Sequence, residues 1–177
     1  MLAIHTERLD LIPLSPVQLQ LVLEQPAQLE QELGMPISRE VVTERVQRAI
    51  RMKLAKMAPI QPQRFPWYTY WLVVIRAARF GAGLAGFKGF PDPNGEAEIG
   101  YGIDPGCGGQ GYTSEAVERL IVWAFEEPAC RAVVARDTKK WNAASLRILA
   151  KMGMRVYQES EEALWLRVER VKNPDLK

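Results

Sequence analysis

A glycine-rich segment near the middle of the chain is the strongest candidate for a binding site. It runs from Asp104 to Tyr112 with the sequence Asp-Pro-Gly-Cys-Gly-Gly-Gln-Gly-Tyr, between a strand-like and a helix-like stretch. At such a junction, free backbone N–H groups and the positive end of the helix dipole can hold a phosphate group. Glycine matters because a side chain would keep the backbone away from a pyrophosphate. The segment predicts a phosphate-binding turn, and a plain flexible connection is the alternative.

Two other phosphate-binding motifs fit this segment less well. Gly106, Gly108 and Gly111 have the spacing of the dinucleotide fingerprint, and Asp137 follows a later strand roughly where that motif has an acid. That motif opens with a buried apolar strand running straight into its first glycine, whereas a polar Asp-Pro pair intervenes here. A Walker loop requires Lys-Ser or Lys-Thr after the last glycine, and neither follows. A dinucleotide site is therefore the disfavoured alternative, and a Walker loop is excluded.

Composition and charge narrow the class of protein. The chain has 177 residues, 47% of them hydrophobic, which is enough for one domain with a buried core. A formal net charge of +2 does not indicate a dedicated nucleic-acid-binding protein. Cys107 and Cys130 stand outside any Cys/His cluster, which disfavours a disulfide framework and a metal site. The charged start and the lack of a long apolar run predict a cytoplasmic protein without a membrane segment.

Apolar periodicity and chain breakers predict an α/β fold around the glycine segment. The expected strands lie near residues 9–13, 70–75, 81–90, 98–103, 132–135, 154–157 and 163–168. The expected helices begin near residue 16, cover 38–57, follow the glycine segment and cover 142–152. The helix over 38–57 has a basic face that we expect to be solvated, with contact to an acidic or RNA-bearing partner as the alternative. We predict a single domain over residues 1–170 and a C-terminal tail over 171–177.

The glycine segment and its flanks resemble the GNAT superfamily of N-acetyltransferases. The coenzyme-A motif of that family is Arg/Gln-x-x-Gly-x-Gly/Ala, and Gly106-x-x-Gly109-x-Gly111 matches it except that Gly106 replaces the usual Arg or Gln. Further segments resemble, in the same order, the branch that acetylates the N-termini of ribosomal proteins: Thr6-Glu-Arg-Leu-Asp-Leu11, Glu98-Ile-Gly-Tyr-Gly-Ile-Asp-Pro105, Gly111-Tyr-Thr-Ser-Glu-Ala116, Asn142-Ala-Ala-Ser145 and Leu149-Ala-Lys-Met-Gly153. The resemblance implies an α/β (α+β) fold with a mixed, twisted sheet of about six or seven strands. Helices would cover both faces, and the fourth and fifth strands would splay apart.

The resemblance also implies a cosubstrate and its binding residues. Acetyl-CoA would place its pantetheine arm in the splay beside the strand that ends at Ile103. Its pyrophosphate would lie against backbone groups of Gly108, Gly109, Gln110, Gly111, Tyr112 and Thr113. For Thr113, helix capping is an alternative or additional role. Asn142 corresponds to a family residue near the pantetheine, and for it too helix capping is the alternative.

The implied activity is direct transfer of an acetyl group to a primary amine through a ternary complex. The amine would belong to a protein N-terminus or to a small molecule. The rival function is a CoA-binding sensor or interaction module, which Gly106 and Leu149 suggest because both depart from the family pattern. No metal, membrane or dedicated nucleic-acid partner is expected, and the protein would be a monomer or a homodimer.

Glu98 and Ser145 are the candidate catalytic residues. The amine must lose a proton before it attacks, since its pKa is about 8 for an α-amine and above 10 for lysine. Glu98 would lie beside the thioester and accept this proton directly or through water, and an ordinary exposed carboxylate is the alternative. In many relatives a tyrosine protonates the departing thiolate, and Leu149 occupies its position here, which leaves this step to Ser145 or water. The lone histidine, His5, is expected to be an incidental surface residue.

Overall fold

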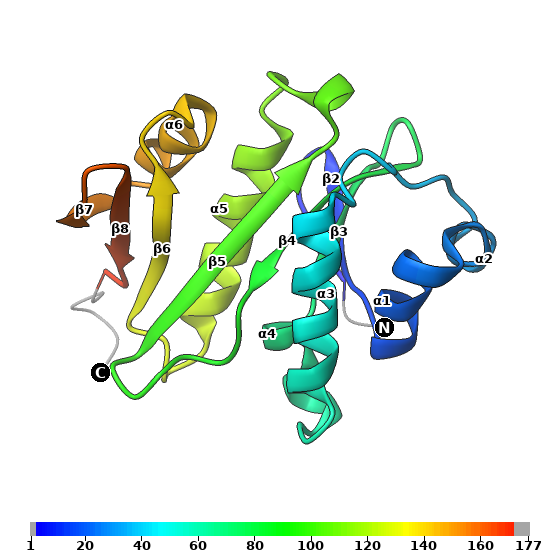
Figure 1. The fold of residues 1–177 in the computed structure, drawn as a ribbon, viewed down its shortest axis with the longest axis horizontal. Coiled ribbons are helices and arrows are strands. Elements are labelled where there is room, and N and C mark those ends of the chain that lie inside the picture. The colour runs from blue at the N-terminus through cyan, green and yellow to red at the C-terminus, as the bar shows by residue number, and fades with distance from the viewer. Residues whose placement is uncertain (1–2, 172–177) are drawn as a thin grey trace.

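The computed structural model describes residues 3–171 as one sheet with helices on both of its faces (Figure 1). The strands are β1 (Ile4–His5), β2 (Leu9–Pro13), β3 (Trp71–Ile75), β4 (Phe80–Phe87), β5 (Glu96–Ile103), β6 (Ala132–Lys139), β7 (Arg155–Glu159) and β8 (Ala163–Glu169). The helices are α1 (Pro16–Glu24), α2 (Pro26–Leu33), α3 (Glu44–Met57), α4 (Phe65–Tyr68), α5 (Tyr112–Glu126) and α6 (Ala143–Lys151). The predicted α/β class is confirmed. The sheet has eight strands rather than six or seven, because β1 is too short to leave an alternating pattern in the sequence.

The strands follow the order β1-β2-β3-β4-β5-β6-β8-β7. Strands β1 to β5 pair antiparallel with their neighbours, which confirms the predicted central meander. Its turn between β4 and β5 closes where Gly95 N–H donates to the carbonyl of Asp92 at 2.7 Å. Gly95 has φ +75°, a conformation that glycine adopts without strain. The β5–β6 pair is parallel and joins this meander to the C-terminal strands.

Strands β5 and β6 separate soon after they begin to pair. Three residues of β5, Glu96 to Glu98, pair with Ala132 to Val134, and no described strand pairs with the rest of β5 on that side. Strand β6 also breaks its register with β8 between Ala135 and Thr138. The predicted splay between the fourth and fifth strands of the resembled fold is therefore confirmed as the gap between β5 and β6, visible in Figure 1.

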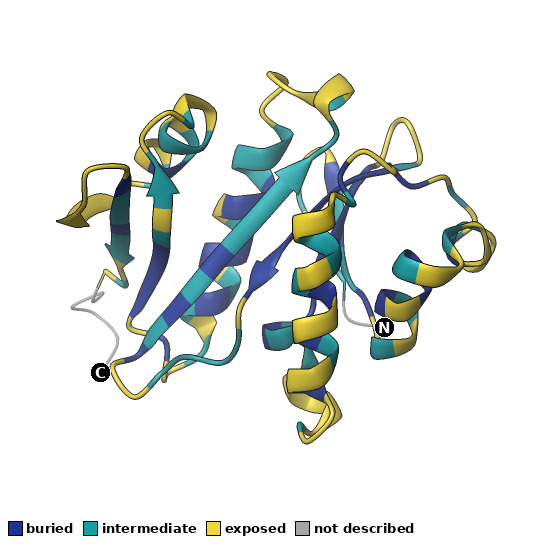
Figure 2. Cartoon of the chain, viewed as in Figure 1, coloured by how far each residue is buried: buried dark blue, intermediate teal, exposed yellow. Residues whose placement is uncertain are grey.

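The two faces of the sheet carry two separate hydrophobic cores. Helices α5 and α6 cover one face, where Val117, Leu120 and Leu149 are fully buried against the strands. Helices α1, α2 and α3 cover the other, with Leu19, Leu29 and Ile50 buried against it. Burial therefore concentrates between helices and sheet, and the outer helix faces are exposed (Figure 2). Both layers are needed to fix β5, since this strand lies between them.

The helix predicted over residues 38–57 is shorter than expected and begins at Glu44. Thr43 caps it, with its hydroxyl accepting from the N–H of Val46. Residues before Thr43 form other bonds: Ser38 N–H donates to the carbonyl of Gly81 at 2.8 Å, and the Ser38 hydroxyl bonds the carboxylate of Asp104. These tertiary bonds outweigh the local helical pattern. Among the described residues, no helix is long and apolar enough to cross a membrane.

Candidate active site

The glycine segment forms the turn between β5 and α5. Gly109 and Gly111 have φ values of +75° and +85°, and Gly111 is the N-cap of α5 without any side-chain cap bond. Thr113 consequently lies inside the helix, and its alternative role as N-cap is wrong. Within the described chain, no acceptor bonds the N–H groups of residues 109–114. Six backbone donors at the positive end of a helix are an arrangement that suits an anion.

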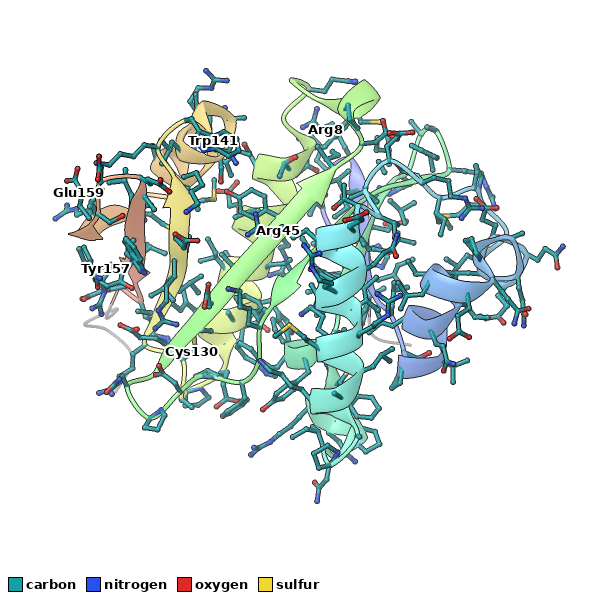
Figure 3. All side chains as sticks on the ribbon, viewed as in Figure 1. Arg8, Arg45, Cys130, Trp141, Tyr157 and Glu159 are labelled. Atoms are coloured by element: carbon teal, nitrogen blue, oxygen red, sulfur yellow. The ribbon has the colours of Figure 1, made fainter. Side chains whose placement is uncertain are left out.

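Arg8 holds this turn against the start of β2. Its guanidinium donates from Nε to Glu115 at 2.7 Å and from Nη1 to the carbonyl of Gln110 at 2.9 Å, and it lies 4.6 Å from the ring centre of Tyr112. Burial raises the pKa of Glu115, but hydrogen bonds from Thr6 and Arg8 outweigh it and keep that pKa below its ordinary value. The carboxylate therefore stays charged and fixes the first turn of α5. Figure 3 shows Arg8 beside this end of the sheet.

The open edge of β5 leads from this turn toward the centre of the molecule. Glu98 and Asp104 exchange backbone bonds with the β4 side, through Lys88 N–H to Glu98 and Asp104 N–H to Ala82. Because alternate residues of a strand point their backbone groups to opposite sides, the peptide groups of Tyr101 and Ile103 face the gap. Unpaired backbone donors and acceptors there suit an amide-containing ligand that lies along the strand.

Tyr101 and Ser145 meet across the gap. The Tyr101 hydroxyl lies 2.8 Å from Oγ of Ser145, and burial raises the pKa of Tyr101 while the bond to Ser145 lowers it, for a net rise. Asn142 is the N-cap of α6, with Oδ1 accepting from the N–H of Ser145 at 3.1 Å. Capping is thus one role of Asn142. Leu149 is fully buried in the core, so the position of the family tyrosine carries no acid here.

A cavity of about 570 Å³ opens between α3 and the β5–β6 gap. Tyr101, Asn142 and Ser145 line it on the α6 side, and Gly100 and Gly102 line it on β5. A side chain at Gly100 would meet no atom within 4 Å, so this glycine leaves open space above the strand. Two exposed apolar side chains are among the lining residues, Met52 from α3 and Trp141 from the β6–α6 loop. Trp141 is 80% exposed, and Figure 3 shows it beside α6.

Glu98 does not belong to the described lining of this cavity. Its carboxylate pairs with Lys88 and, at 3.4 Å, with Nη1 of Arg136, and both of these cations do line the cavity. Its side chain is 13% exposed. Lys88 and Arg136 therefore lie between the Glu98 carboxylate and the cavity, whereas Ser145 and Asn142 line the cavity together with Tyr101.

The remaining candidates have structural roles or none at the cavity. Burial and the nearby carboxylate of Asp104 raise the pKa of the Cys107 thiol, which disfavours the thiolate form there. His5 is exposed and pairs with Asp10 at 2.8 Å. Residues 3–171 contain no group of three or more His, Cys, Asp or Glu side chains that could hold a metal ion.

Sequence reasoning missed three side chains around this site. Arg8 was visible only as part of a strand motif, and its partner Glu115 lies 107 residues away. Tyr101 was seen as a strand residue, because its contact with Ser145 is not local. Lys53 lay within a basic helix, yet it is 6% exposed and its ammonium donates to the carbonyls of Tyr68, Thr69 and Phe87.

Comparison with known proteins identifies the family of the chain. Residues 8–155 match the family model of the acetyltransferase (GNAT) domain. The uncharacterized N-acetyltransferase YjdG of Bacillus subtilis (strain 168) is 33% identical over 92 residues, which cover 52% of this chain and 54% of that protein. The chain thus matches about half the length of this curated relative.

Solved structures share the fold over nearly the whole chain. A putative ribosomal-protein-serine acetyltransferase from Vibrio cholerae is 18% identical with a TM-score of 0.63, over 96% of this chain and 98% of that one. A ribosomal-protein-S5-alanine acetyltransferase from Vibrio fischeri is 15% identical with a TM-score of 0.64, over 97% and 98%. A RimL ribosomal L7/L12 α-N-protein acetyltransferase in complex with coenzyme A is 17% identical with a TM-score of 0.65, over 95% and 98%. With most of its length matched by the family model, the chain belongs to the GNAT acetyltransferase domain family.

Proposed function

We propose that the chain is an acetyl-CoA-dependent N-acetyltransferase that passes the acetyl group directly to a primary amine in a ternary complex. The observation that carries this proposal is the row of six unbonded N–H groups over residues 109–114, at the end of a strand whose outer edge is open. An anion-binding turn continuous with an open strand edge fits a ligand with a pyrophosphate at one end and amide groups along its arm. Family membership gives the same expectation.

The residues that would bind acetyl-CoA follow from this fit. Backbone N–H groups over Gly109–Thr113, which include Gln110, would hold the pyrophosphate, whereas the N–H of the predicted Gly108 already donates to the carbonyl of Pro105 at 3.1 Å. Tyr101 and Ile103 would bond the pantetheine amides through their free peptide groups, and Asn142 would present its side-chain NH₂ beside them. When bound, acetyl-CoA supplies an activated acyl group as a thioester. Of the free peptide groups, the N–H of Tyr101 would stabilise the negative charge that develops on the thioester oxygen, which leaves its carbonyl and the peptide groups of Ile103 for the pantetheine.

Glu98 remains the proposed base for the acceptor ammonium. Since its carboxylate is paired with Lys88 and Arg136, it would take the proton through a water molecule at the cavity wall. The neutral amine nitrogen then forms its bond to the acyl carbon while the carbon–sulfur bond breaks. No acyl-enzyme is needed, which agrees with the raised pKa of Cys107.

Ser145 and Tyr101 together form the proposed acid for the departing thiolate. Ser145 would donate its hydroxyl proton, Tyr101 would replace it along their 2.8 Å hydrogen bond, and the proton that the attacking nitrogen loses as the amide forms would return to Tyr101 through solvent. Because burial keeps the pKa of Tyr101 raised, this hydroxyl retains its proton near neutral pH. This pair compensates for Leu149 at the usual tyrosine position, which favours an enzyme over a sensor that binds CoA without turnover.

The wider setting is also part of the proposal. The acceptor is a protein N-terminus or a small-molecule amine, and the names of the ribosomal-protein acetyltransferases with similar folds favour the first. We place the chain in the cytoplasm as a monomer or homodimer, without a metal. We also propose residues 1–170 as a single domain. Of the predicted tail, residues 172–177 lie outside the described part of the chain.

The proposal is tested by following thiol release from acetyl-CoA with N-terminal peptides, polyamines, amino acids and aminoglycosides as acceptors. We expect release that depends on the acceptor, and intersecting double-reciprocal lines because both substrates must be bound together. Parallel lines would contradict direct transfer. Tight CoA binding without turnover on any acceptor would favour the sensor instead.

A further inference from the structure

The cavity between α3 and the β5–β6 gap is lined mainly by positive charge. Seven basic side chains line it, against the single carboxylate of Asp137: Arg45, Arg48, Lys53, Lys56, Lys88, Arg136 and Lys139. The whole chain has a formal net charge of only +2, so this charge is concentrated at one place. A cavity lined by one sign of charge focuses the field and raises the local concentration of oppositely charged ligands.

Most of these cations already have partners, and two do not. Lys88 and Arg136 pair with Glu98, and Lys139 pairs with Asp137 at 3.1 Å. Lys53 and Lys56 donate to backbone carbonyls. Within residues 3–171, Arg45 and Arg48 make no ion pair or side-chain hydrogen bond. Both lie on the cavity side of α3, and Figure 3 shows Arg45 between α3 and β5.

The phosphates of CoA do not account for this charge. The anion-binding turn follows Ile103, and none of its described residues from 108 to 113 lines the cavity. Lys88 lies at the other end of β5, where its N–H donates to Glu98. Ile103 lies five positions after Glu98 on this strand, a distance of roughly 16 Å. The basic wall of α3 instead faces Tyr101 and Ser145, where the amine would react.

We propose that the acceptor is an acidic amine, with one or more carboxylates that Arg45 and Arg48 bind while its amino group lies near Ser145. The inference rests on the proposed acetyl transfer and specifies its substrate class. A guanidinium is suited to this role because its planar fork binds a carboxylate through two parallel hydrogen bonds. Gly100 leaves room for such a molecule over the strand. The carboxylate can belong to acidic residues that follow a peptide N-terminus or to a small amino acid.

The test compares acceptors of matched length whose side chains are acidic, neutral or basic. Initial rates are measured with C-terminally amidated peptides Ser-Asp-Glu-Ala-Ala, Ser-Asn-Gln-Ala-Ala and Ser-Lys-Lys-Ala-Ala, and with free glutamate against glutamine. The peptide pair and the amino acid pair distinguish the two sources of the carboxylate. Calorimetry with the same compounds and the CoA-bound protein gives affinities that do not require turnover.

The variants are the double substitution Arg45→Gln/Arg48→Gln and the matched control Arg51→Gln. Arg51 is exposed on the same helix and does not line the cavity. We expect kcat/KM for the acidic acceptor to exceed that for its neutral counterpart at least tenfold. In the double variant, kcat/KM for the acidic acceptor should fall about tenfold. The KM for acetyl-CoA should stay unchanged, the control should behave as wild type, and the preference should shrink as salt rises.

Equal rates and equal affinities for acidic and neutral acceptors would overturn the inference, as would an unchanged preference in the double variant. If the acidic compound binds through Arg45 and Arg48 but no acceptor is turned over, the proposed function fails and the anion-binding site formed by these two arginines stands. If neutral acceptors are turned over equally well, the proposed function stands and the substrate class is wrong.

Discussion

Replacing Lys53 by Met is expected to change how the stability of the fold depends on pH. Burial, followed by repulsion from Lys56 and Lys88, lowers the pKa of Lys53 from 10.5 to about 7. Between these values the unfolded chain binds more protons at this site than the folded chain does. The folded protein therefore gains stability as the pH rises through that window, and below pH 7 the full cost of the buried charge is present.

The size of the effect follows from the same two values. A pKa displaced from 10.5 to about 7 corresponds to at most about 5 kcal/mol of unfolding free energy. The carbonyls of Tyr68, Thr69 and Phe87 hold the ammonium and offset part of this cost. We therefore expect the wild type to gain about 2 kcal/mol between pH 7 and 9.5 relative to Lys53→Met.

Urea unfolding at half-unit steps from pH 6 to 9.5 measures this difference. The matched control is Arg51→Met, on the same helix but exposed and not among the groups that lower the pKa of Lys53, whose pH dependence should follow the wild type. Lys53→Met should also lose a stability increment that does not depend on pH, because three buried carbonyls lose their donor. If the difference in unfolding free energy between wild type and Lys53→Met stays constant from pH 6 to 9.5, the pKa of Lys53 is not lowered by folding.

Three further substitutions test the proposed site. Gly111→Val should raise the Kd for CoA at least tenfold, because the new side chain would meet Arg8 at 3.3 Å and φ at this position is +85°. Gly153→Val, with φ +70° outside the site, is the control for backbone strain. Equal CoA affinity of Gly111→Val and wild type in calorimetry would place the pyrophosphate elsewhere. Glu98→Gln should lower kcat roughly ten- to a thousandfold near neutral pH without changing CoA affinity. The defect should shrink at high pH, because free amine is abundant there. Wild-type turnover at every pH would make Glu98 a purely structural partner of Lys88. Tyr101→Phe should lower kcat about ten- to a hundredfold in single-turnover assays while KM stays the same, and an unchanged kcat would leave Ser145 or water as the acid.

The parts of the fold that the sequence predicts are those with local causes. The meander, the Gly95 turn and the capping of α6 by Asn142 each depend on residues only a few positions apart. The anion-binding turn is similar, since glycines and a following helix suffice to predict it. The start of α3 could not be predicted in this way, because Ser38 leaves the helical pattern to bond Asp104 and Gly81, which are distant in the sequence.

The parts of the site that the sequence does not predict depend on contacts between distant segments. Tyr101 and Ser145 are 44 residues apart and meet only because α6 packs beside the gap. Lys53 has the same residue type as its exposed neighbour Lys56, and only the packing of α3 on the sheet separates their environments. The basic cavity likewise gathers residues from α3, β4 and β6, so that a chain with a small net charge holds a strongly positive surface.

The proposed acetyl transfer requires that the backbone of residues 109–114 bind the pyrophosphate of acetyl-CoA. Two-dimensional amide NMR of the labelled protein, recorded during titration with CoA, measures this most directly. The N–H resonances of Gly109, Gly111 and Thr113 should move downfield and become protected from exchange as they gain acceptors, while those of Gly34 and Gly153 stay in place. If saturating CoA leaves the resonances of residues 109–114 unmoved, or shifts those of a different segment instead, the pyrophosphate does not bind at this turn.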